Sequence, residues 1–230
     1  LPIFRGMLAL YEMLIMGIEA LSYSAGIVGE EEEQLTNKDI AFAIIFAFGF
    51  AILLFIVVPT VAVRFIASSL NNPLLLNLLE GLIRILVFLI YIVSISFMKD
   101  IRRVFEYHGA EHKTVHCYEN NEKLIPENVK KYKTLHPRCG TNFLLIVMVV
   151  SILLFSFLGW PGIIMRITTR ILLLPLVAGI SYEFIKLAGK SNSPLISILS
   201  APGMWLQKLT TREPDERQIE VAILALKSVL

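Results

Sequence analysis

Charged residues are scarce in this chain: they make up 17% of its 230 residues, whereas soluble domains carry about a quarter. Hydrophobic residues make up 56% of the chain, and the mean hydropathy is +0.70. This composition argues against an ordinary soluble domain. The formal net charge is only +2, so charge by itself favours no particular partner.

Cysteines are rare, and basic stretches with interleaved aromatic residues are missing. The only cysteines are Cys117 and Cys139, which excludes a disulfide scaffold. Without a basic, aromatic-rich stretch we expect no nucleic acid partner. Residues 1–5 have neither the charge nor the cleavage site of a signal peptide, and we expect native sequence ahead of Leu1.

Four apolar runs are long enough to cross a bilayer, whose hydrocarbon core of about 30 Å needs roughly 20 residues of helix. The predicted spans are residues 40–63, 80–98, 143–160 and 166–187. Backbone groups in lipid must be satisfied locally, so these runs should be helical. The turn-forming residues 159–162 join the last two spans into a predicted hairpin. The sequence thus predicts an all-α, polytopic membrane bundle, with residues 1–230 as one domain because no linker divides them.

The flanking segments are less apolar than the spans. Residues 2–25 contain Arg5, Glu12 and Glu19, which make a free-standing span costly, so we favour an amphipathic interfacial helix; a fifth span stays open. Residues 194–209 form a second interfacial stretch. Residues 214–230 predict an amphipathic helix with Pro214 at its first position. Its apolar face, turned towards the membrane or a partner, consists of Ile219, Ala222, Ile223, Leu226 and Val229.

Lysine and arginine predict the orientation of the spans. Segment 99–142 carries nine of the 21 basic residues. If this segment is cytosolic, the opposite side carries only Arg64, Arg84, Arg166 and Arg170. The positive-inside rule therefore predicts a protein of the cell membrane, with segment 99–142 and both ends of the chain on the cytosolic side. That compartment keeps both cysteines reduced and available as ligands.

The histidines are clustered in this same segment. All four, His108, His112, His116 and His136, lie within 29 residues, and both cysteines lie in or beside that window. Imidazole and thiolate are preferred ligands of zinc and neighbouring metals. The sequence therefore predicts one site for a divalent metal, with zinc as the first expectation.

The spacing of the histidines limits which of them can share an ion. Residues 99–118 contain no proline and should continue the second span as a helix, with a histidine every four residues along one stripe. His108 and His116 are then about 12 Å apart along the axis, so one ion takes two of the three and adds ligands from elsewhere. The turn around Pro137 supplies them. The predicted ligands are His108, His112, His136 and Cys139.

A short motif in the same helix suggests catalysis. Residues 108–112 match H-x-x-E-H, in which two histidines bind zinc and the glutamate activates water. We therefore expect Glu111 to be the catalytic base. Ligand candidates ranked behind the four are His116, Cys117 and the carboxylates Glu183, Glu12, Glu19 and Glu119. Glu183 stands out because a charge deep in an apolar run indicates function.

Plainer interpretations stay open for several of these residues. The histidine stripe can line a polar juxtamembrane surface, and Cys117 can be a small buried side chain. Glu183 can pair with Lys186 or with an arginine of segment 99–142. For Arg84, near one end of the second span, we expect snorkelling or a pair with Glu80.

Two motifs resemble the signature of the YqhQ-like family of bacterial membrane proteins. They are Tyr107-His108-Gly109-Ala110-Glu111-His112-Lys113-Thr114 and His136-Pro137-Arg138-Cys139-Gly140-Thr141. The resemblance extends to residues 2–6, 178–183 and 210–214. It implies a membrane protein of unknown function that is labelled, by prediction, a metal-dependent enzyme. It also singles out His108, Glu111, His112, His136 and Cys139, whereas His116 and Cys117 lie outside the motifs.

The sequence is compatible with three functions. The first is a metal-dependent hydrolase at the cytosolic face, with an open position on the metal and Glu111 as base. The second is a membrane scaffold or assembly factor with a structural metal closed by four ligands. The third is a metal sensor or transporter, which residues 40–63 disfavour because they contain no charge. We expect membrane lipid as a partner; a homo-oligomer and the substrate (lipid, peptide or small molecule) stay open.

Overall fold

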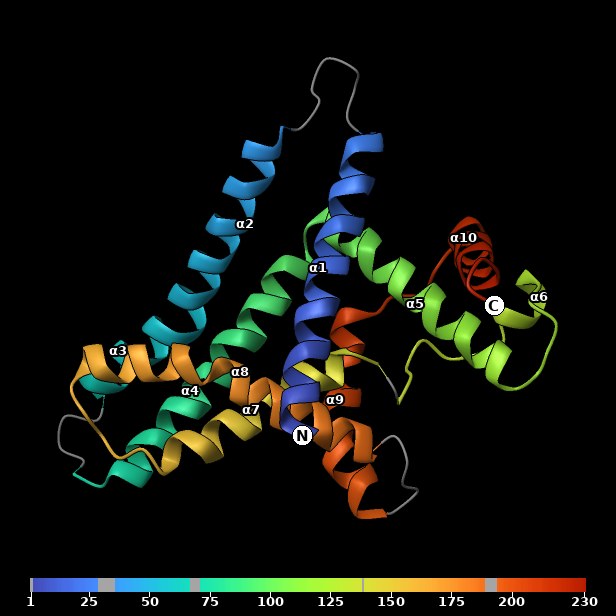
Figure 1. The fold of residues 1–230 in the computed structure, drawn as a ribbon. Coiled ribbons are helices and arrows are strands. Elements are labelled where there is room, and N and C mark those ends of the chain that lie inside the picture. Colours follow the sequence, from blue (N-terminus) through green and yellow to red (C-terminus); the bar gives the residue numbers. More distant parts are fainter. Residues whose placement is uncertain (1, 29–35, 67–70, 138, 189–193) are drawn as a thin grey trace. The chain divides into compact units, whose positions relative to one another are not determined.

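The computed structural model describes residues 2–28, 36–66, 71–137, 139–188 and 194–230, and within these ranges the chain is all helical, as predicted (Figure 1). Arg138, part of the second motif, lies outside the described residues. The elements are α1 Pro2–Val28, α2 Asn37–Ile52, η1 Leu53–Val57, α3 Val58–Ile66, α4 Pro73–Ser96, α5 Lys99–Glu119, α6 Pro126–Val129, α7 Thr141–Ser156, α8 Ile163–Ala188, α9 Pro194–Thr210 and α10 Glu216–Lys227.

Three stretches of helix are long and apolar enough to cross a membrane: Lys38–Phe65, Pro73–Ser96 and Ile163–Leu187. They match the first and fourth predicted spans and overlap the second, which starts seven residues earlier than predicted and ends at Ser96. The third, residues 143–160, is shorter than expected, because α7 ends at Ser156 after 16 residues. At 1.5 Å per residue it measures about 24 Å, below the roughly 30 Å of a hydrocarbon core. The predicted third span, residues 143–160, therefore stays a prediction.

The described residues group into two compact units, each treated by itself below. Unit 1 comprises Leu1–Val87 and Val147–Lys186, and unit 2 comprises Phe88–Ile146 and Leu187–Leu230. The three boundaries fall inside α4, α7 and α8, so each of these helices contributes residues to both units.

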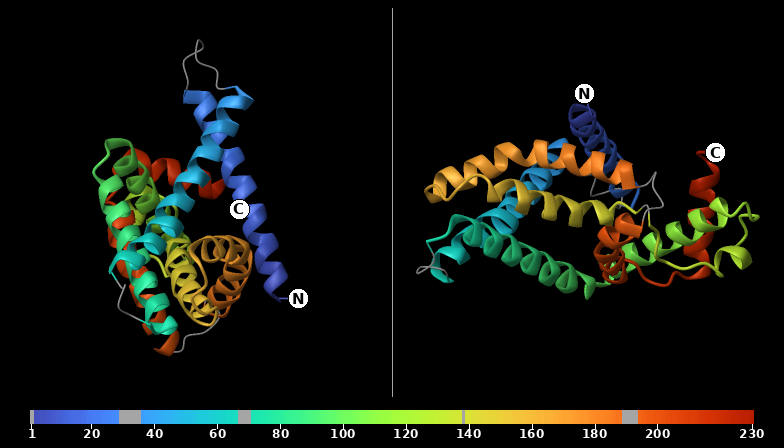
Figure 2. Two further views of the ribbon diagram at one scale, coloured as in Figure 1. Left: turned by 90° about the vertical axis from the view of Figure 1, so that its left-hand side faces the viewer. Right: turned by 90° about the horizontal axis from the view of Figure 1, so that it is seen from below.

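Unit 1 brings α4, the end of α7 and α8 side by side (Figure 2). The turn between α7 and α8 passes through Gly159 at φ +69°, which forms the predicted hairpin. On α4, Gly81 lies so close to Ile152 of α7 that a side chain at position 81 would collide with it. α1 packs on α8, where Gly6 and Gly179 meet. Such small-residue contacts let helices approach closely where lipid offers no hydrophobic driving force.

Unit 2 is organised around α5, against which α6 and α10 pack (Figure 1). Its buried core consists of Ala110, Cys117, Val129, Ile219 and Ile223. Ile219 and Ile223 therefore face α5, not the membrane or a partner as the amphipathic pattern suggested. The pattern identified an apolar face correctly but could not say which surface covers it.

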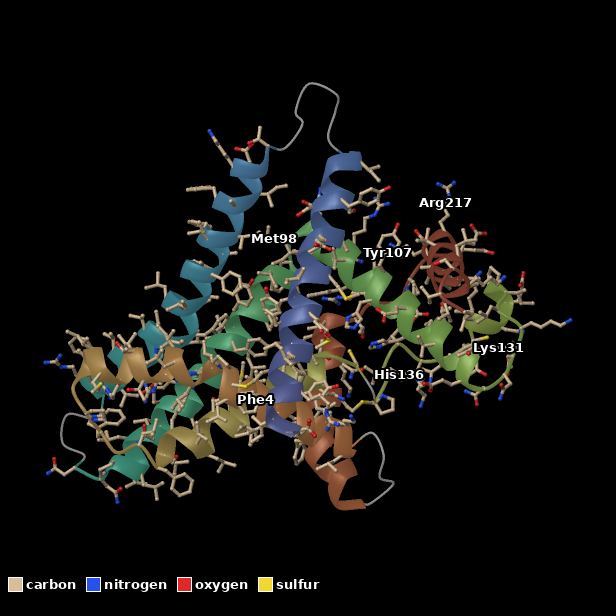
Figure 3. The ribbon with its side chains drawn as sticks, viewed as in Figure 1. Phe4, Met98, Tyr107, Lys131, His136 and Arg217 are labelled. Atoms are coloured by element: carbon tan, nitrogen blue, oxygen red, sulfur yellow. The ribbon has the colours of Figure 1, made fainter. Side chains whose placement is uncertain are left out.

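Two predicted helix starts need correction. α5 does not continue the second span, because Met98 is extended (φ −71°, ψ 133°) and interrupts the helix there (Figure 3). α10 starts at Glu216, and Pro214 precedes its cap. A capping box fixes this start: the Gln218 amide N–H donates to Asp215 Oδ1, and the Asp215 amide N–H donates to Gln218 Oε1, both at 2.8 Å.

A glycine on α5 controls how closely the chain ahead of α10 approaches. A Cβ at Gly109 would collide with the backbone carbonyl of Arg212. In the same place the Arg212 amide donates to the Phe105 carbonyl at 2.9 Å. Residues 210–212 thus cross α5 in direct backbone contact.

We expect Gly109→Ala to lower the thermal midpoint of the purified protein. The added Cβ would collide with the Arg212 carbonyl, and a backbone group cannot avoid the collision by rotating, as a side chain can. Overpacking of this kind costs about 1–3 kcal/mol, or several degrees for a chain of this length. Thermal unfolding in detergent, followed by circular dichroism, measures the change. Gly17→Ala in α1 is the matched control, because a Cβ there meets nothing within 4 Å. Equal midpoints for the two variants would contradict the backbone contact.

Candidate metal centre

α5 places three histidines on one face, as the four-residue spacing predicted. The ring centroids of His108 and His112 are 4.4 Å apart. His136, from the segment that follows α6, joins them beside α5 (Figure 3). Its ring centroid lies 4.4 Å from that of His116 and 5.7 Å from that of His112. The four histidines of the chain therefore form one continuous cluster within unit 2.

The segment carrying His136 is held by a buried amide side chain from α9. The His136 amide N–H donates to Gln207 Oε1, and Gln207 Nε2 donates back to the His136 carbonyl, both at 2.8 Å. Gln207 Nε2 also donates to Asn142 Oδ1 at 3.1 Å. Gln207 is fully buried, so water cannot compete for these bonds. Nothing in the sequence pattern pointed to Gln207.

Backbone carbonyls fix which ring nitrogens face the centre. His108 Nδ1 donates to the Thr210 carbonyl at 2.8 Å, and His112 Nδ1 donates to the Thr134 carbonyl at 2.5 Å. His116 Nε2 donates to the Leu135 carbonyl at 2.9 Å. A carbonyl only accepts, so these nitrogens carry the hydrogens. The remaining nitrogens, Nε2 of His108 and His112 and Nδ1 of His116, are the atoms that could bind a metal, as in most ligating histidines, and any hydrogen they donate to Cys139 would be released on binding.

The potential ligand atoms fall into two groups. The first group is His108, His112 and Cys139, and the second group is His116, Glu119 and His136. Within each group the ligand atoms lie within 4.8 Å of one another. The four ligands expected for one ion are thus divided: three lie in the first group, and His136 lies in the second with His116 and Glu119, which ranked lower on the sequence.

A cavity of about 460 Å³ opens onto both groups. Its lining combines ligand candidates with the expected base and residues of the second motif: His108, Glu111, His112, Val115, Glu119, His136, Cys139, Gly140 and Thr141. Glu111 is exposed and borders the cavity, so its carboxylate is accessible to a molecule bound there.

Cys139 has the electrostatics of a ligand. Burial by itself raises the pKa of the thiol, but hydrogen bonds from His108, His112 and Thr141 outweigh burial and lower the pKa to about 5. His108 Nε2 lies 3.2 Å from Cys139 Sγ. The thiolate, which is the form that binds metal, therefore predominates at neutral pH.

The histidines respond to the same environment in opposite directions. Burial lowers the pKa of His108, but its contacts with Cys139 and the Thr210 carbonyl prevail and raise it overall. Burial lowers the pKa of His136, and the neighbouring His116 and His112 lower it further against the opposing effect of Glu119. His136 is thus favoured in the neutral form that a metal requires.

Two lower-ranked candidates have other contacts. Cys117 is fully buried in the core of unit 2, where burial raises the pKa of its thiol, in keeping with its interpretation as a small buried side chain. Glu183 belongs to unit 1 and accepts hydrogen bonds from Arg5 Nη2 at 2.7 and 2.8 Å. It pairs with neither Lys186 nor segment 99–142 in these bonds, and neither ligand group found among the described residues contains it.

Comparison with known proteins identifies the family. The model of a family described as "Protein of unknown function (DUF1385)" matches residues 1–230. The chain belongs to this family. It is 34% identical over 249 residues to "Uncharacterized protein YqhQ" of Bacillus subtilis (strain 168), a match covering 100% of this chain and 77% of the relative. The resemblance seen in the motifs is thereby confirmed. No solved structure matches the chain.

We expect iodoacetamide to label Cys139 of the folded protein at pH 7, and Cys117 only after unfolding. The rate at Cys139 should fall as pH drops through about 5, where the thiolate gains a proton. Peptide mass spectrometry measures both sites. Cys139→Ser is the control and should lose the rapid labelling. Faster labelling of Cys117 in the folded state would contradict the described environments.

Proposed function

We propose that this protein binds a divalent metal, zinc in the first instance, and acts as a metal-dependent hydrolase at the cytosolic face of the membrane. One observation carries the proposal. The Nδ1 atoms of His108 and His112 are both tied to backbone carbonyls, so their Nε2 atoms are left beside the Cys139 thiolate. Two oriented imidazoles and one thiolate with a low pKa form a donor set that zinc prefers.

The first group fits such an ion in size. Zinc lies about 2.0–2.1 Å from nitrogen and 2.3 Å from sulfur, so tetrahedral ligand atoms are roughly 3.3–3.7 Å apart. The distance from His108 Nε2 to Cys139 Sγ is 3.2 Å, and all three ligand atoms lie within 4.8 Å of one another. Small rotations of the side chains would complete the geometry.

The number of ligands favours catalysis over a purely structural role. Three protein ligands leave one tetrahedral position for water, whereas structural sites are closed by four. His136, which would have been the fourth ligand, is grouped with His116 and Glu119. The open position would face the cavity that Glu111 borders.

Each residue then has a chemical role. A bound zinc ion supplies Lewis acidity and lowers the pKa of a coordinated water towards 7. Glu111 would accept the proton of the attacking water, and the carbonyls of Thr210 and Thr134 would hold the ligand rings in position. Thr141, whose amide donates to Cys139 Sγ at 3.4 Å, would keep the thiolate in place.

The membrane setting is part of the proposal. The three long apolar helices support a multi-pass membrane protein. The nine basic residues of segment 99–142 support a cytosolic position for the histidine cluster. Phe42, Phe46 and Phe50 of α2 are exposed, as expected of side chains that face lipid.

Metal content of the detergent-purified protein, prepared without chelator, tests the first group. We expect His112→Ala and Cys139→Ala each to remove one equivalent of zinc relative to wild type. Glu111→Gln should retain the metal, because Glu111 is assigned as base and not as ligand, and should lose hydrolytic activity by a factor of about 100 or more.

Cys117→Ala is the matched control, because it removes the other thiol without touching the centre, and it should retain all metal. Wild-type protein that stays metal-free even after zinc is added would overturn the metal proposal. In that case the short contact between His108 and Cys139 would favour a different candidate, a cysteine nucleophile activated by histidine.

The second group allows a second ion beside the first. We expect wild type to bind two equivalents and His116→Ala to lose only one, because His116 Nδ1 is oriented by the Leu135 carbonyl in the same way as the other rings. Elemental analysis of His116→Ala, His112→Ala and the double variant measures this. A total of one equivalent that either single variant abolishes would mean one shared, closed ion, and would favour a scaffold with a structural metal.

A further inference from the structure

A second polar cluster lies inside unit 1, within the helices that are apolar enough to span a membrane. Three buried arginines, Arg84, Arg166 and Arg170, surround a single buried carboxylate, Glu80. Arginine stays protonated in proteins, so the cluster holds three positive charges against one negative charge. A buried charge without compensation is costly, and it is retained where it has a function.

Arg84 and Arg170 each donate several hydrogen bonds to protein groups. Arg84 donates to the Phe55 carbonyl at 2.9 Å, to Ser151 Oγ at 3.2 Å and to Glu80 Oε1 at 3.1 Å. Arg170 donates to Glu80 and, at 2.6 and 3.1 Å, to Thr60 Oγ1 and Asn77 Oδ1. These arginines hold the helices of unit 1 together.

Arg166 is different. It is 5% exposed, yet its Nε and Nη1 atoms have no hydrogen-bond partner. The nearest carboxylate oxygen, Glu80 Oε2, lies 3.9 Å from Nη1, and that oxygen also has no hydrogen-bond partner. The guanidinium instead stacks on Trp160, 3.8 Å from the ring centroid. A buried guanidinium held flat by an aromatic ring, with Nε and Nη1 making no hydrogen bond, is oriented to receive a ligand.

A cavity of about 170 Å³ adjoins this group, and Arg166, Arg170, Asn77 and Thr169 contribute polar side chains to its lining. α4 and α8 both begin at this end of unit 1, so the positive ends of their dipoles add to the field of the arginines. The surplus of positive charge, the unused donors and the adjoining space select an anion. Guanidinium groups match phosphate oxygens with paired hydrogen bonds.

We propose that Arg166 and Arg170 bind a phosphate group, either that of a lipid headgroup or free phosphate. The depth of the site suits a headgroup. Arg166 is the fourth residue of α8, so its Cα lies only about 5 Å along the axis from the start of a helix long enough to cross the bilayer. This site does not depend on the metal centre, so each proposal can fail without the other.

Trp160 reports on the site directly, because Arg166 stacks on it. The chain has two tryptophans, and Trp205→Phe leaves Trp160 as the sole tryptophan, which is excited selectively at wavelengths where tyrosine does not absorb. The full chain with Trp205→Phe, in a neutral detergent, is titrated with short-chain phosphatidic acid, with diacylglycerol of the same chains, and with inorganic phosphate. A saturable change in emission with phosphatidic acid but not with diacylglycerol supports the site. Competition by millimolar inorganic phosphate identifies free phosphate as the ligand, and its failure to compete identifies the lipid.

Arg166→Gln should weaken phosphatidic acid binding by about tenfold or more, the loss expected for charge-assisted hydrogen bonds. Because Nε and Nη1 have no hydrogen bonds to lose and Arg166 adds to the surplus of positive charge, its thermal midpoint without ligand should equal or exceed that of wild type. Arg170→Gln, which breaks bonds to Glu80, Thr60 and Asn77, should lower the midpoint. Arg217→Gln, an exposed arginine of α10 in unit 2, is the control and should bind as wild type does.

Arg166→Lys gives a second measurement, because lysine keeps the charge but not the planar fork, and it should bind with intermediate affinity. Equal binding by wild type, Arg166→Gln and Arg166→Lys would overturn the proposal. The proposal would also be overturned if the thermal midpoint of Arg166→Gln without ligand fell as far as that of Arg170→Gln, because Arg166 would then stabilise the fold instead of binding a ligand.

Discussion

The backbone contact between residues 210–212 and α5 is the constraint on which the histidine centre depends. Gly109 has no Cβ, so the chain after α9 can lie directly on the helix, and Arg212 donates to the Phe105 carbonyl. That position brings the Thr210 carbonyl to His108 Nδ1. It also starts α10 where Ile219 and Ile223 can bury against α5. One glycine thus couples the packing of unit 2 to the orientation of a ring in its centre.

Orientation within the centre comes mostly from main-chain atoms. Thr134, Leu135 and Thr210 contribute carbonyls, and Gln207 fixes the His136 backbone from both sides. Main-chain groups lose little freedom when they bind, and their positions are set by the fold as a whole. An arrangement of this kind holds ligands ready before any ion arrives, which is the condition for a metal to bind without rebuilding the site.

The histidine cluster of unit 2 and the arginine cluster of unit 1 differ in how their charge can change. In unit 2 His108, His112, His136 and Cys139 border an open cavity, and their charges can adjust by gaining or losing protons. In unit 1 the arginines cannot lose their charge, and a single carboxylate opposes three of them. The Glu80–Arg84 pair, one of the two possibilities expected from the sequence, is present. It belongs to a larger hydrogen-bonded cluster that also includes Thr60 and Asn77.

The sequence by itself determined the helical class, the positions of the long apolar helices, the family and the histidine stripe on α5. Each of these depends on residue type and on spacing within one segment, which a linear pattern contains. The tertiary structure decided which residues meet across segments. It placed Cys139 with His108 and His112, grouped His136 with His116 and Glu119, paired Glu183 with Arg5 and brought Gln207 beneath His136. Those contacts join residues up to 178 positions apart, and their choice depends on how helix faces pack, which no local periodicity specifies.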